Sequence, residues 1–293
     1  MQHNAAQLTA ARIVGDRARP APVVVRPGLN ESLKRGWTDV RGALARWHLA
    51  MIFGWQDMAQ RYKRSKIGVF WLSINTAVMI TAIGLLFSML LRTPLQQFLP
   101  YLTLGIIFYS FISTYINESC QTYMSYQGII LQVPLPLFTH LLRVFYRNMV
   151  VLGHNIVIIP LVFLAVGKET SWAVLLALPG FLIVSVNVLW IGVILSVFCT
   201  RFRDLTQIVT NAIQVTFYMT PIMWMPSILP PDRVDTVLTP NPFFHLLEIV
   251  RAPIMGDVPS ATNWMVTIIM AVVGWAAALI VLGRYRHRIP FWL

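Results

Sequence analysis

Long uncharged, apolar stretches alternate with short charged or proline-containing segments along most of this chain. Between residues 67 and 283, uncharged runs of 20 to 31 residues recur, with isolated charges between them. A helix rises about 1.5 Å per residue, so ~20 apolar residues cross a hydrocarbon core of about 30 Å. A helix of a soluble protein would instead show a polar face at regular spacing. The pattern predicts an all-α membrane protein with several spans and excludes a water-soluble globular enzyme.

The uncharged stretches predict six spans, bounded by charges or prolines. They lie at about residues 67–91, 101–117, 148–167, 171–199, 205–224 and 264–282. The uncharged segment between Glu118 and Arg143 is left out of this set, because its glutamines and prolines are poorly suited to a helix that faces lipid. We expect a re-entering cytoplasmic loop with a short helix there.

The proline-rich segment at residues 225–263 is too long for a simple turn, yet it carries several large apolar side chains. Backbone at membrane depth must be helical or buried in protein, because lipid offers no hydrogen-bond partners. We therefore predict short re-entrant helices at the periplasmic face before the last span. Glu248 and Arg251 are three residues apart and are expected to pair on one of these helices, as part of a periplasmic gate or, alternatively, in a merely structural role.

Residues 30–62 form a predicted amphipathic helix before the first span. Large apolar residues recur there at spacings of three and four: Trp37, Val40, Leu44, Trp47, Met51, Trp55, Met58 and Tyr62. Tryptophans flanked by Lys and Arg favour a helix in the headgroup region of the membrane, and the alternative is a helix packed on a soluble partner. Residues 1–29 are polar and contain proline, and we expect a flexible cytoplasmic leader.

Composition and charge give the chain an orientation. Hydrophobic residues make up 57% of the 293 residues and charged residues 12%, against about 25% charged residues in soluble domains. Lys and Arg number 23 and Asp and Glu 11, a net charge of +12. With both termini in the cytoplasm, the inner segments hold 19 of the 23 basic residues and the outer segments 4. Positive-inside asymmetry therefore predicts cytoplasmic termini, and the basic charge indicates a membrane flank and not a nucleic-acid site.

The chain offers little material for catalysis. His154 is the only imidazole within a predicted span, and a packing role is expected for it. Cys120 and Cys199 are expected to be small packing residues. No His-x-x-x-His spacing is present, and the segment around Lys168 lacks the pattern of a nucleotide-binding loop. We expect no catalytic site, metal or cofactor in this chain. Because the span centres also lack the ionisable groups of ion-coupled transporters, energy for transport would come from another subunit.

Several motifs, taken in order, resemble a known family. They are RYKRSKIGVFW at 61–71, GIILQVPLP at 128–136, RVFYRN at 143–148, His154-Asn155, RFRDLTQI at 201–208, TPIMW at 220–224, and Asn241-Pro242 followed by Glu248, Arg251, Gly256 and Pro259. Over most of residues 33–293 the chain resembles the membrane subunit of ABC-2-type exporters, in the polysaccharide and O-antigen branch. It departs from the family at Thr76, where relatives often have Pro, and at Leu137, where a basic residue is usual.

The resemblance implies the fold, the partners and the activity. The fold would be the six-span ABC-2 fold, like that of type V exporters, in a homodimer that binds two copies of a cytoplasmic ABC ATPase. That ATPase would bind ATP and Mg²⁺. The complex would export a lipid-linked glycan, usually on an undecaprenyl carrier, from the cytoplasm to the periplasm across the bacterial inner membrane. Teichoic acid, a drug or another lipid are alternative cargoes within this fold. A membrane-bound glycan-modifying transferase is the alternative of another class and would need converging Asp and His groups.

Two groups of candidate site residues follow. Aromatic side chains with few charges let a glycan slide, which suggests a substrate pathway lined by Phe70, Trp71, Phe87, Gln214, Phe217, Tyr218 and Trp224. For Trp71 and Trp224 the alternative is an aromatic belt that faces headgroups. Polar-edged cytoplasmic elements suggest ATPase coupling through Trp47, Gln132, Arg201, Arg203 and Asp204. For the last three, the alternative is simple positive-inside anchoring.

Overall fold

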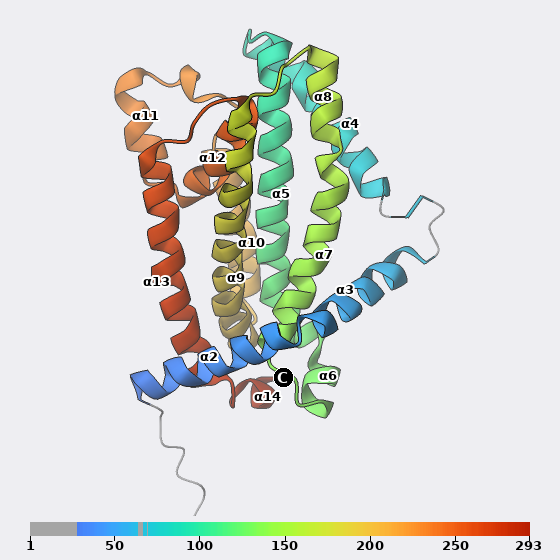
Figure 1. Cartoon of the computed structure of the whole chain (residues 1–293), viewed down its shortest axis with the longest axis vertical. Coiled ribbons are helices and arrows are strands. Elements are labelled where there is room, and N and C mark those ends of the chain that lie inside the picture. Colours follow the sequence, from blue (N-terminus) through green and yellow to red (C-terminus); the bar gives the residue numbers. More distant parts are fainter. Residues whose placement is uncertain (1–27, 64–66, 69) are drawn as a thin grey trace, which may run out of the picture.

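The protein is an upright bundle of long helices with a pair of helices across one end (Figure 1). The computed structural model describes residues 28–63, 67–68 and 70–293, and all regular structure in these residues is helical. Most of the predicted leader, and part of the basic motif before the first span, lie outside the described residues. Helices α2 (Leu29–Ala45) and α3 (Trp47–Tyr62) lie across what we call the inner end, together with α6 (Gln127–Gln132) and α14 (Ile289–Trp292).

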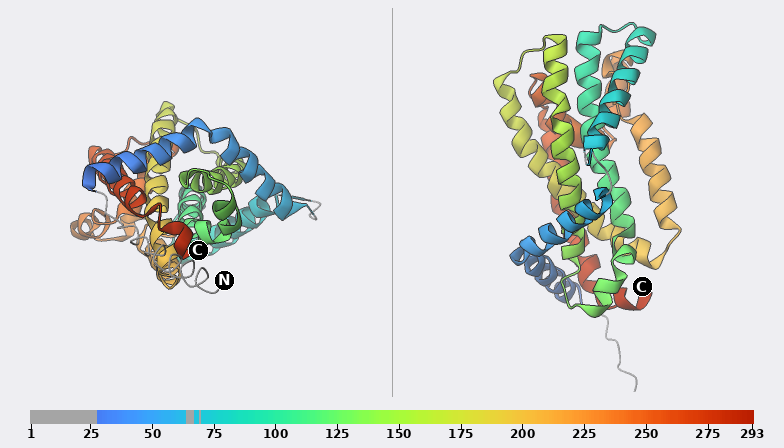
Figure 2. Two further views of the ribbon diagram at one scale, coloured as in Figure 1. Left: turned by 90° about the horizontal axis from the view of Figure 1, so that it is seen from below. Right: turned by 90° about the vertical axis from the view of Figure 1, so that its right-hand side faces the viewer.

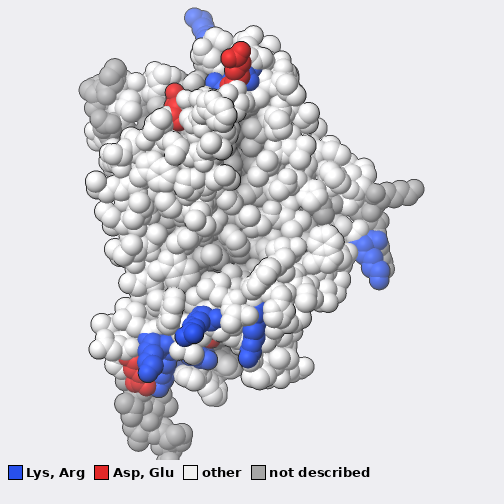
Figure 3. All heavy atoms as spheres, viewed as in Figure 1, with Lys and Arg blue, Asp and Glu red and all other residues white. Residues whose placement is uncertain are grey.

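Five helical segments of the described chain are long and apolar enough to cross a membrane. Three of them are single helices: α4 (Phe70–Leu90), α5 (Leu95–Ser125) and α13 (Ala261–Tyr285). Segment Phe138–Val166 consists of α7 (Phe138–Ile156) and α8 (Ile158–Val166). Segment Trp172–Arg201 consists of the 3₁₀ turn η1 (Trp172–Leu176) and α9 (Ala177–Arg201). Charged side chains on the face in Figure 3 gather near the two ends of the bundle and at the far end of α3. These features establish an all-α, multi-pass membrane protein.

The sixth predicted span, residues 205–224, corresponds to a shorter helix. Helix α10 (Leu205–Met219) has 15 residues, which gives a length of about 22 Å. It ends because Pro221 favours extended backbone at the residue before it, and Thr220 has φ −86° and ψ 137°. That α10 crosses the membrane stays a prediction.

Helix α5 is the centre of the bundle and packs against α4, α7, α9 and α10. It extends beyond the predicted 101–117 in both directions, and α7 begins ten residues before the predicted start at 148. The predicted boundaries were too narrow because Glu118 and Arg147 are paired with each other and do not end their helices. Between the two helices lies the six-residue α6, where we expected a short helix. The junction of α7 and α8 precedes Pro160, which lacks the amide hydrogen that would bond to Ile156.

The segment predicted as one amphipathic helix is two helices, which is a correction to the prediction for residues 30–62. Arg46 separates them with φ −115° and ψ 31°, outside the helical region. The bend lets α2 pack on α13 and α3 pack on α7. Glycines make both contacts close: a Cβ on Gly36 would lie 2.1 Å from the Leu279 carbonyl oxygen, and one on Gly54 would lie 2.9 Å from the Arg143 carbonyl oxygen. The sequence pattern of large apolar residues did not show these contacts of small residues.

The tryptophans of α2 and α3 point away from the bundle. Trp37, Trp47 and Trp55 are 54%, 57% and 59% exposed, whereas Val40 and Met58 are buried. An amphipathic helix in the headgroup region has its tryptophans in such positions. The exposure agrees with the predicted interfacial placement, which stays a prediction because the structure contains no membrane.

Gly283 of α13 lies close against α2, and its substitution gives a stability test. A Cβ at this position would lie 1.8 Å from the Ser32 carbonyl oxygen. We expect Gly283→Ala to force the two helices apart and to destabilise the protein by about 1–3 kcal/mol, the usual cost of overpacking. The measurement is the thermal unfolding midpoint of the purified chain. Gly153→Ala is the matched control, because a Cβ there meets nothing within 4 Å. Equal midpoints for the two variants would contradict the contact.

The proline-rich segment before the last span contains η2 (Pro226–Ile228), α11 (Pro231–Leu238) and α12 (Pro242–Met255). The Asn241 side chain caps α12 by accepting hydrogen bonds from the backbone amides of Phe243 and Phe244, at 3.0 and 3.3 Å. Helix α12 packs against α5, α9 and α13, and most of its residues are buried. The segment contains short helices, as we predicted. That they re-enter the outer leaflet stays a prediction.

Candidate functional site

Helix α10 presents a polar stripe on the outside of the chain. Gln207, Asn211, Gln214 and Tyr218 recur at spacings of three and four, so they share one helix face, and all four are exposed. The Gln207 amide donates to the Asn211 side chain at 3.1 Å. We call these four residues the α10 stripe. Amide groups are costly against lipid because hydrocarbon offers no hydrogen bonds. The stripe is therefore suited to a water-filled space or to another polar surface.

The opposite face of α10 packs on α5. Ile213 is the buried residue of this helix, and its carbonyl oxygen accepts a hydrogen bond from the Tyr109 hydroxyl at 2.6 Å. The Phe217 ring is half-buried and meets the Tyr109 ring edge to face, at a centroid distance of 5.4 Å. Tyr218 is 63% exposed. The Tyr218 ring lies on the stripe and meets the Phe217 ring edge to face at 5.4 Å, while Phe217 also contacts α5. That the two residues line a pathway stays a prediction.

The other predicted pathway residues lie in different surroundings. Phe70 and Trp71 are 60% and 58% exposed at the start of α4, and the Phe70 ring lies 5.1 Å from the His154 ring. Phe87 is half-buried against the central core. The half-buried Trp224 donates its indole hydrogen to the Tyr218 carbonyl oxygen at 3.2 Å. The aromatic residues of α4 and α10 belong to two helices that each pack on α5.

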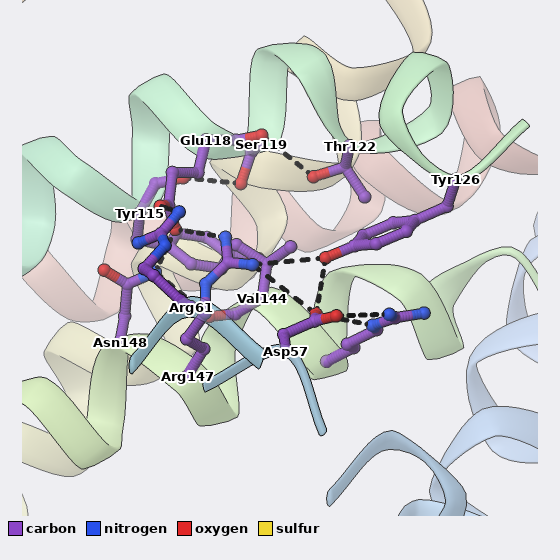
Figure 4. A network of polar contacts seen from close by, with 11 residues as sticks. Asp57, Arg61, Tyr115, Glu118, Ser119, Thr122, Tyr126, Val144, Arg147 and Asn148 are labelled. Carbon is purple, nitrogen blue, oxygen red and sulfur yellow. Dashed lines mark hydrogen bonds and ion pairs between the residues drawn. The ribbon is translucent and has the colours of Figure 1, made fainter. Parts of the chain in front are cut away.

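A cluster of charged residues joins α3, α5 and α7 (Figure 4). Arg143 binds the Asp57 carboxylate with two hydrogen bonds, Nε to Oδ2 at 2.7 Å and Nη2 to Oδ1 at 2.5 Å. Its guanidinium also lies 3.9 Å from the centre of the Tyr126 ring, and the Tyr126 hydroxyl donates to Asp57 at 2.8 Å. Two-point pairing of this kind is among the strongest contacts of a carboxylate. Asp57 therefore fastens α3 to α7.

Glu118 forms the second half of the cluster. It accepts a hydrogen bond from Asn148 at 2.7 Å and pairs with Arg147 at 2.8 Å. Arg147 also reaches Asp57 at 3.5 Å, so it connects the two carboxylates. Arg61 approaches Glu118 only to 4.0 Å. We call Asp57, Arg61, Glu118, Arg143 and Arg147 the ionic cluster.

The electrostatics of the cluster favour the ionised carboxylate of Asp57. Partial burial raises the pKa of this group, but hydrogen bonds from Arg143 and Tyr126 and the charges of Arg143 and Arg147 outweigh burial, so its pKa lies below the ordinary value. Our sequence analysis missed this cluster. The signal was present, because Arg143 and Arg147 are one helical turn apart in a largely apolar segment, where unpaired charges would be costly.

The residues predicted for ATPase coupling gather at the inner end. Trp47 begins α3, Gln132 ends α6, and both are exposed. Arg201 ends α9, with its guanidinium carbon 5.7 Å from the Trp292 ring of α14. Arg203 and Asp204 are exposed in the turn between α9 and α10. Figure 1 shows α6, α14 and the ends of α9 and α10 at this end of the bundle, and Figure 2 shows it from below. The positions suit a docking surface, and the coupling role stays a prediction.

The predicted pair Glu248 and Arg251 is present, but it is more buried than a surface pair. The Arg251 side chain is 1% exposed and the Glu248 side chain 22%, and their atoms are 2.6 Å apart. Arg251 also donates to the Pro221 carbonyl oxygen at 2.6 Å and lies 3.9 Å from the centre of the Tyr101 ring. The Tyr101 hydroxyl donates to the same carbonyl oxygen at 2.9 Å. Arg251 therefore joins α12 to α5 and to the segment after α10, and its role as a gate stays a prediction.

The described residues contain no group of three or more His, Cys, Asp or Glu side chains placed to hold a metal ion. Cys120 and Cys199 are buried free thiols within the bundle. The His154 ring lies 2.7 Å from the Val150 carbonyl oxygen, one turn earlier in α7. These positions agree with the packing roles that we expected for all three residues.

Comparison with known proteins gives two results. The sequence model of a family described as ABC-2 type transporter matches residues 48–255. Three curated relatives are named O-antigen export system permease protein RfbA. The protein of Myxococcus xanthus is 23% identical over 232 residues, which cover 78% of this chain and 89% of the relative. Two proteins of Klebsiella pneumoniae are each 25% identical, over 200 and 208 residues that cover 66% and 69% of this chain and 74% and 78% of the relatives.

Proposed function

We propose, because this chain belongs to the ABC-2 type transporter family, that it is the transmembrane subunit of an ATP-driven exporter of a lipid-linked, O-antigen-like polysaccharide. A member of this family is the membrane subunit of a transporter, spans the lipid bilayer several times and works with an ABC ATPase on a separate subunit. The names of the three curated relatives support an O-antigen as the cargo. The observation on the molecule that carries the proposal is the exposed α10 stripe.

The chemistry of the α10 stripe suits a glycan. Its two glutamines and its asparagine offer amide donors and acceptors to sugar hydroxyls, and Tyr218 offers an aromatic face to the C–H face of a sugar ring. None of the four side chains carries a charge at neutral pH. A fixed positive charge would hold an acidic polymer tightly and slow its passage. The stripe thus favours many weak, exchangeable contacts along a moving chain.

One chain leaves the α10 stripe open on its outer side, so a closed pathway needs a second wall. We propose that a second copy of the chain supplies it in a homodimer. The cargo would move from the cytoplasm to the periplasm of a bacterium on an undecaprenyl carrier, across the inner membrane. Both termini of the chain would lie in the cytoplasm. The basic residues at the inner end support this orientation through the positive-inside tendency.

The inner end is the proposed docking surface for two copies of the ATPase. The predicted coupling residues lie on three parts of this end: α3 (Trp47), α6 (Gln132) and the junction of α9 with α10 (Arg201, Arg203 and Asp204). Through the ionic cluster, α3 is fastened to α5 and α7, so motion at the docking surface would reach the bundle. ATP and Mg²⁺ would bind to the ATPase, and this chain would hold no cofactor and carry out no catalysis.

Restored export in cells tests the proposed function. The chain and its ATPase are expressed in a strain that makes a lipid-linked O-antigen but lacks its own exporter. We expect the glycan to reach the cell surface, where antibody or lectin labelling of intact cells detects it. Expression with a hydrolysis-deficient ATPase is the control and leaves the glycan inside. Glycan retained inside by the active pair, with both subunits in the membrane, would contradict the proposal.

Tyr218 provides a residue-level test of the pathway. We expect Tyr218→Ala to lower the export rate about two- to twelvefold, because an aromatic contact is worth about 0.5–1.5 kcal/mol. Expression and basal ATP hydrolysis should stay at the wild-type level, since this side chain is 63% exposed. Met219→Ala is the matched control, because Met219 is 61% exposed but lies next to the stripe and not on it. Equal export by the two variants would contradict the assignment of Tyr218.

A further inference from the structure

A polar cleft lies beside the ionic cluster and is not explained by the α10 stripe. It is a cavity of about 310 Å³ between α3, α5 and α7. Val144 is the apolar residue of its lining, and the other lining residues have polar or charged side chains: Arg61, Asn117, Glu118, Gln121, Thr122, Ser125, Tyr126 and Arg147. A second cavity of about 230 Å³ shares Arg61, Glu118 and Arg147 with the first and extends to α4. We call the two together the α3–α5–α7 cleft.

The charges around the cleft leave one guanidinium free for a ligand. The ionic cluster has three arginines and two carboxylates, so its net charge is 3 − 2 = +1. Arg143 is bound to Asp57, and Arg147 is bound to Glu118. The Arg61 side chain is 54% exposed, and within the described part of the chain its ion pair is the one with Glu118, at 4.0 Å. The excess positive charge of the cleft is therefore held by Arg61.

The groups near Arg61 are hydrogen-bond donors of the kind that bind phosphate. Gln121 and Ser125 line the same cavity and are exposed, so their amide and hydroxyl groups can turn toward a ligand. Glu118 is the one carboxylate in the lining, and Arg147 and Asn148 already occupy it. A guanidinium with neighbouring neutral donors binds the oxygens of a phosphate with several charge-assisted hydrogen bonds. The polar part of the cleft thus fits a phosphate or pyrophosphate group.

The second cavity indicates that the ligand has an apolar tail. Beyond the three residues that it shares with the first cavity, its wall holds five apolar side chains (Leu72, Ile107, Phe111, Val151 and Leu152) and five uncharged polar ones (Thr76, Ser110, Thr114, Asn148 and Asn155). The cleft therefore changes from polar and basic near the inner end to an uncharged, half-apolar wall toward α4. A free phosphate ion would use only the first part. A lipid that bears a phosphate at its head would use both.

The cleft also adjoins the α10 stripe. Asn117 lines the first cavity, and its side-chain oxygen accepts a hydrogen bond from the Thr210 hydroxyl of α10 at 3.1 Å. Thr210 is the neighbour of Asn211 in the stripe. A head group held at Arg61 would therefore lie one helix, α5, away from the proposed pathway.

We propose that the α3–α5–α7 cleft binds the phosphate-bearing head of a lipid, with Arg61 as the binding cation. This inference rests on the proposed function, under which the phosphate belongs to the lipid carrier of the glycan before the glycan enters along α10. The same chemistry occurs in an anionic membrane phospholipid, and the test separates these two sources.

Binding of farnesyl pyrophosphate, a short isoprenoid pyrophosphate, to the full chain in phosphatidylcholine nanodiscs tests the proposal. We expect Arg61→Ala to weaken binding about tenfold or more, as the loss of a charge-assisted pair predicts. Arg61→Lys keeps the charge but not the two-point geometry, so a smaller loss is expected. Arg41→Ala removes an exposed arginine of the neighbouring helix α2 and is the control, with unchanged binding. Farnesol, inorganic pyrophosphate and phosphatidylglycerol serve as competitors.

The competitors decide the ligand. In the competition experiment, the bound ligand is labelled farnesyl pyrophosphate. If farnesol displaced it as strongly as unlabelled farnesyl pyrophosphate does, the proposal would be overturned, because farnesol has no phosphate. Displacement by phosphatidylglycerol at equal concentration would support a lipid phosphate site and identify the membrane phospholipid as its source. A clear preference for farnesyl pyrophosphate would identify the carrier. Equal effects of Arg61→Ala and Arg41→Ala would overturn the site.

Failure of this site and failure of the proposed function give different results. If Arg61→Ala bound farnesyl pyrophosphate normally and the wild-type chain exported glycan, the proposed lipid-phosphate site would be refuted and the exporter assignment would stand. If binding depended on Arg61 but the wild-type chain exported no glycan, the lipid-phosphate site would be supported and the exporter assignment would be refuted.

Discussion

Arg143→Met is expected to lower the free energy of unfolding by about 2–3 kcal/mol and to abolish most export. The substitution leaves the Asp57 carboxylate, whose side chain is 17% exposed, without its two-point partner, and an unpaired charge in such a position is costly. The loss falls short of that for a fully buried pair because Tyr126 and Arg147 still reach Asp57. Export should fall because α3 is then less firmly held on α7.

The measurement is the thermal unfolding midpoint of the purified chain, together with surface glycan in cells. Arg46→Met makes the same chemical change at an exposed position between α2 and α3 and should leave both at the wild-type level. The double variant Asp57→Asn with Arg143→Met should recover part of the loss, because it removes the stranded charge. A double variant whose loss equals the sum of the two single losses would contradict a direct pair.

Arg251→Met is expected to have the largest effect on stability, about 3–5 kcal/mol. Arg251 is 1% exposed, and its removal leaves Glu248 without a partner and takes one of two donors from the Pro221 carbonyl oxygen. The contact between α12 and the segment after α10 would loosen. The measurement is again the unfolding midpoint, and a wild-type value for Arg251→Met would rule out the proposed brace.

Glu248→Gln separates a brace from a gate at the same position. The Glu248 side chain is 22% exposed, and Arg251 keeps its contacts to Pro221 and Tyr101 when the carboxylate becomes an amide. A structural role for the pair predicts a clear loss of stability, because the buried Arg251 guanidinium loses its counter-charge. A gating role predicts a changed export rate at nearly unchanged stability, which is the outcome that our sequence-based prediction of a periplasmic gate requires.

The sequence predicted the long helices well because a membrane imposes a length and an apolar composition on each span. It predicted their ends poorly. The sequence predicts the end of a span at Glu118, yet α5 continues to Ser125 because Arg147 neutralises the carboxylate from another helix. Pairing of this kind joins residues far apart in the chain, and a hydropathy pattern contains no information about it. The division of residues 30–62 at Arg46 was missed for a similar reason, since it depends on which helices the two halves meet.

The candidate site was predictable where a pattern lies on one helix and not where it joins several. The sequence shows a polar and aromatic mixture around Gln214 and Tyr218, and the structure places both side chains exposed on one face of α10. Their role in a pathway stays a prediction. The sequence could not show that Phe217 turns toward Tyr109 of α5. The α3–α5–α7 cleft requires three helices to be placed relative to one another. The sequence shows its arginines, and only the fold shows that, among the described residues, Arg61 lies no closer than 4.0 Å to the Glu118 carboxylate with which it pairs.

The central claim is that the glycan passes along the α10 stripe, and photo-crosslinking during ATP turnover tests it most directly. A photoreactive amino acid replaces Gln214 on the stripe or, as the control, Val272 of α13, which is 67% exposed on an apolar helix. The account predicts glycan adducts at position 214 that need an active ATPase, and none at position 272. Adducts at position 272, or none at position 214 while export continues, would contradict it.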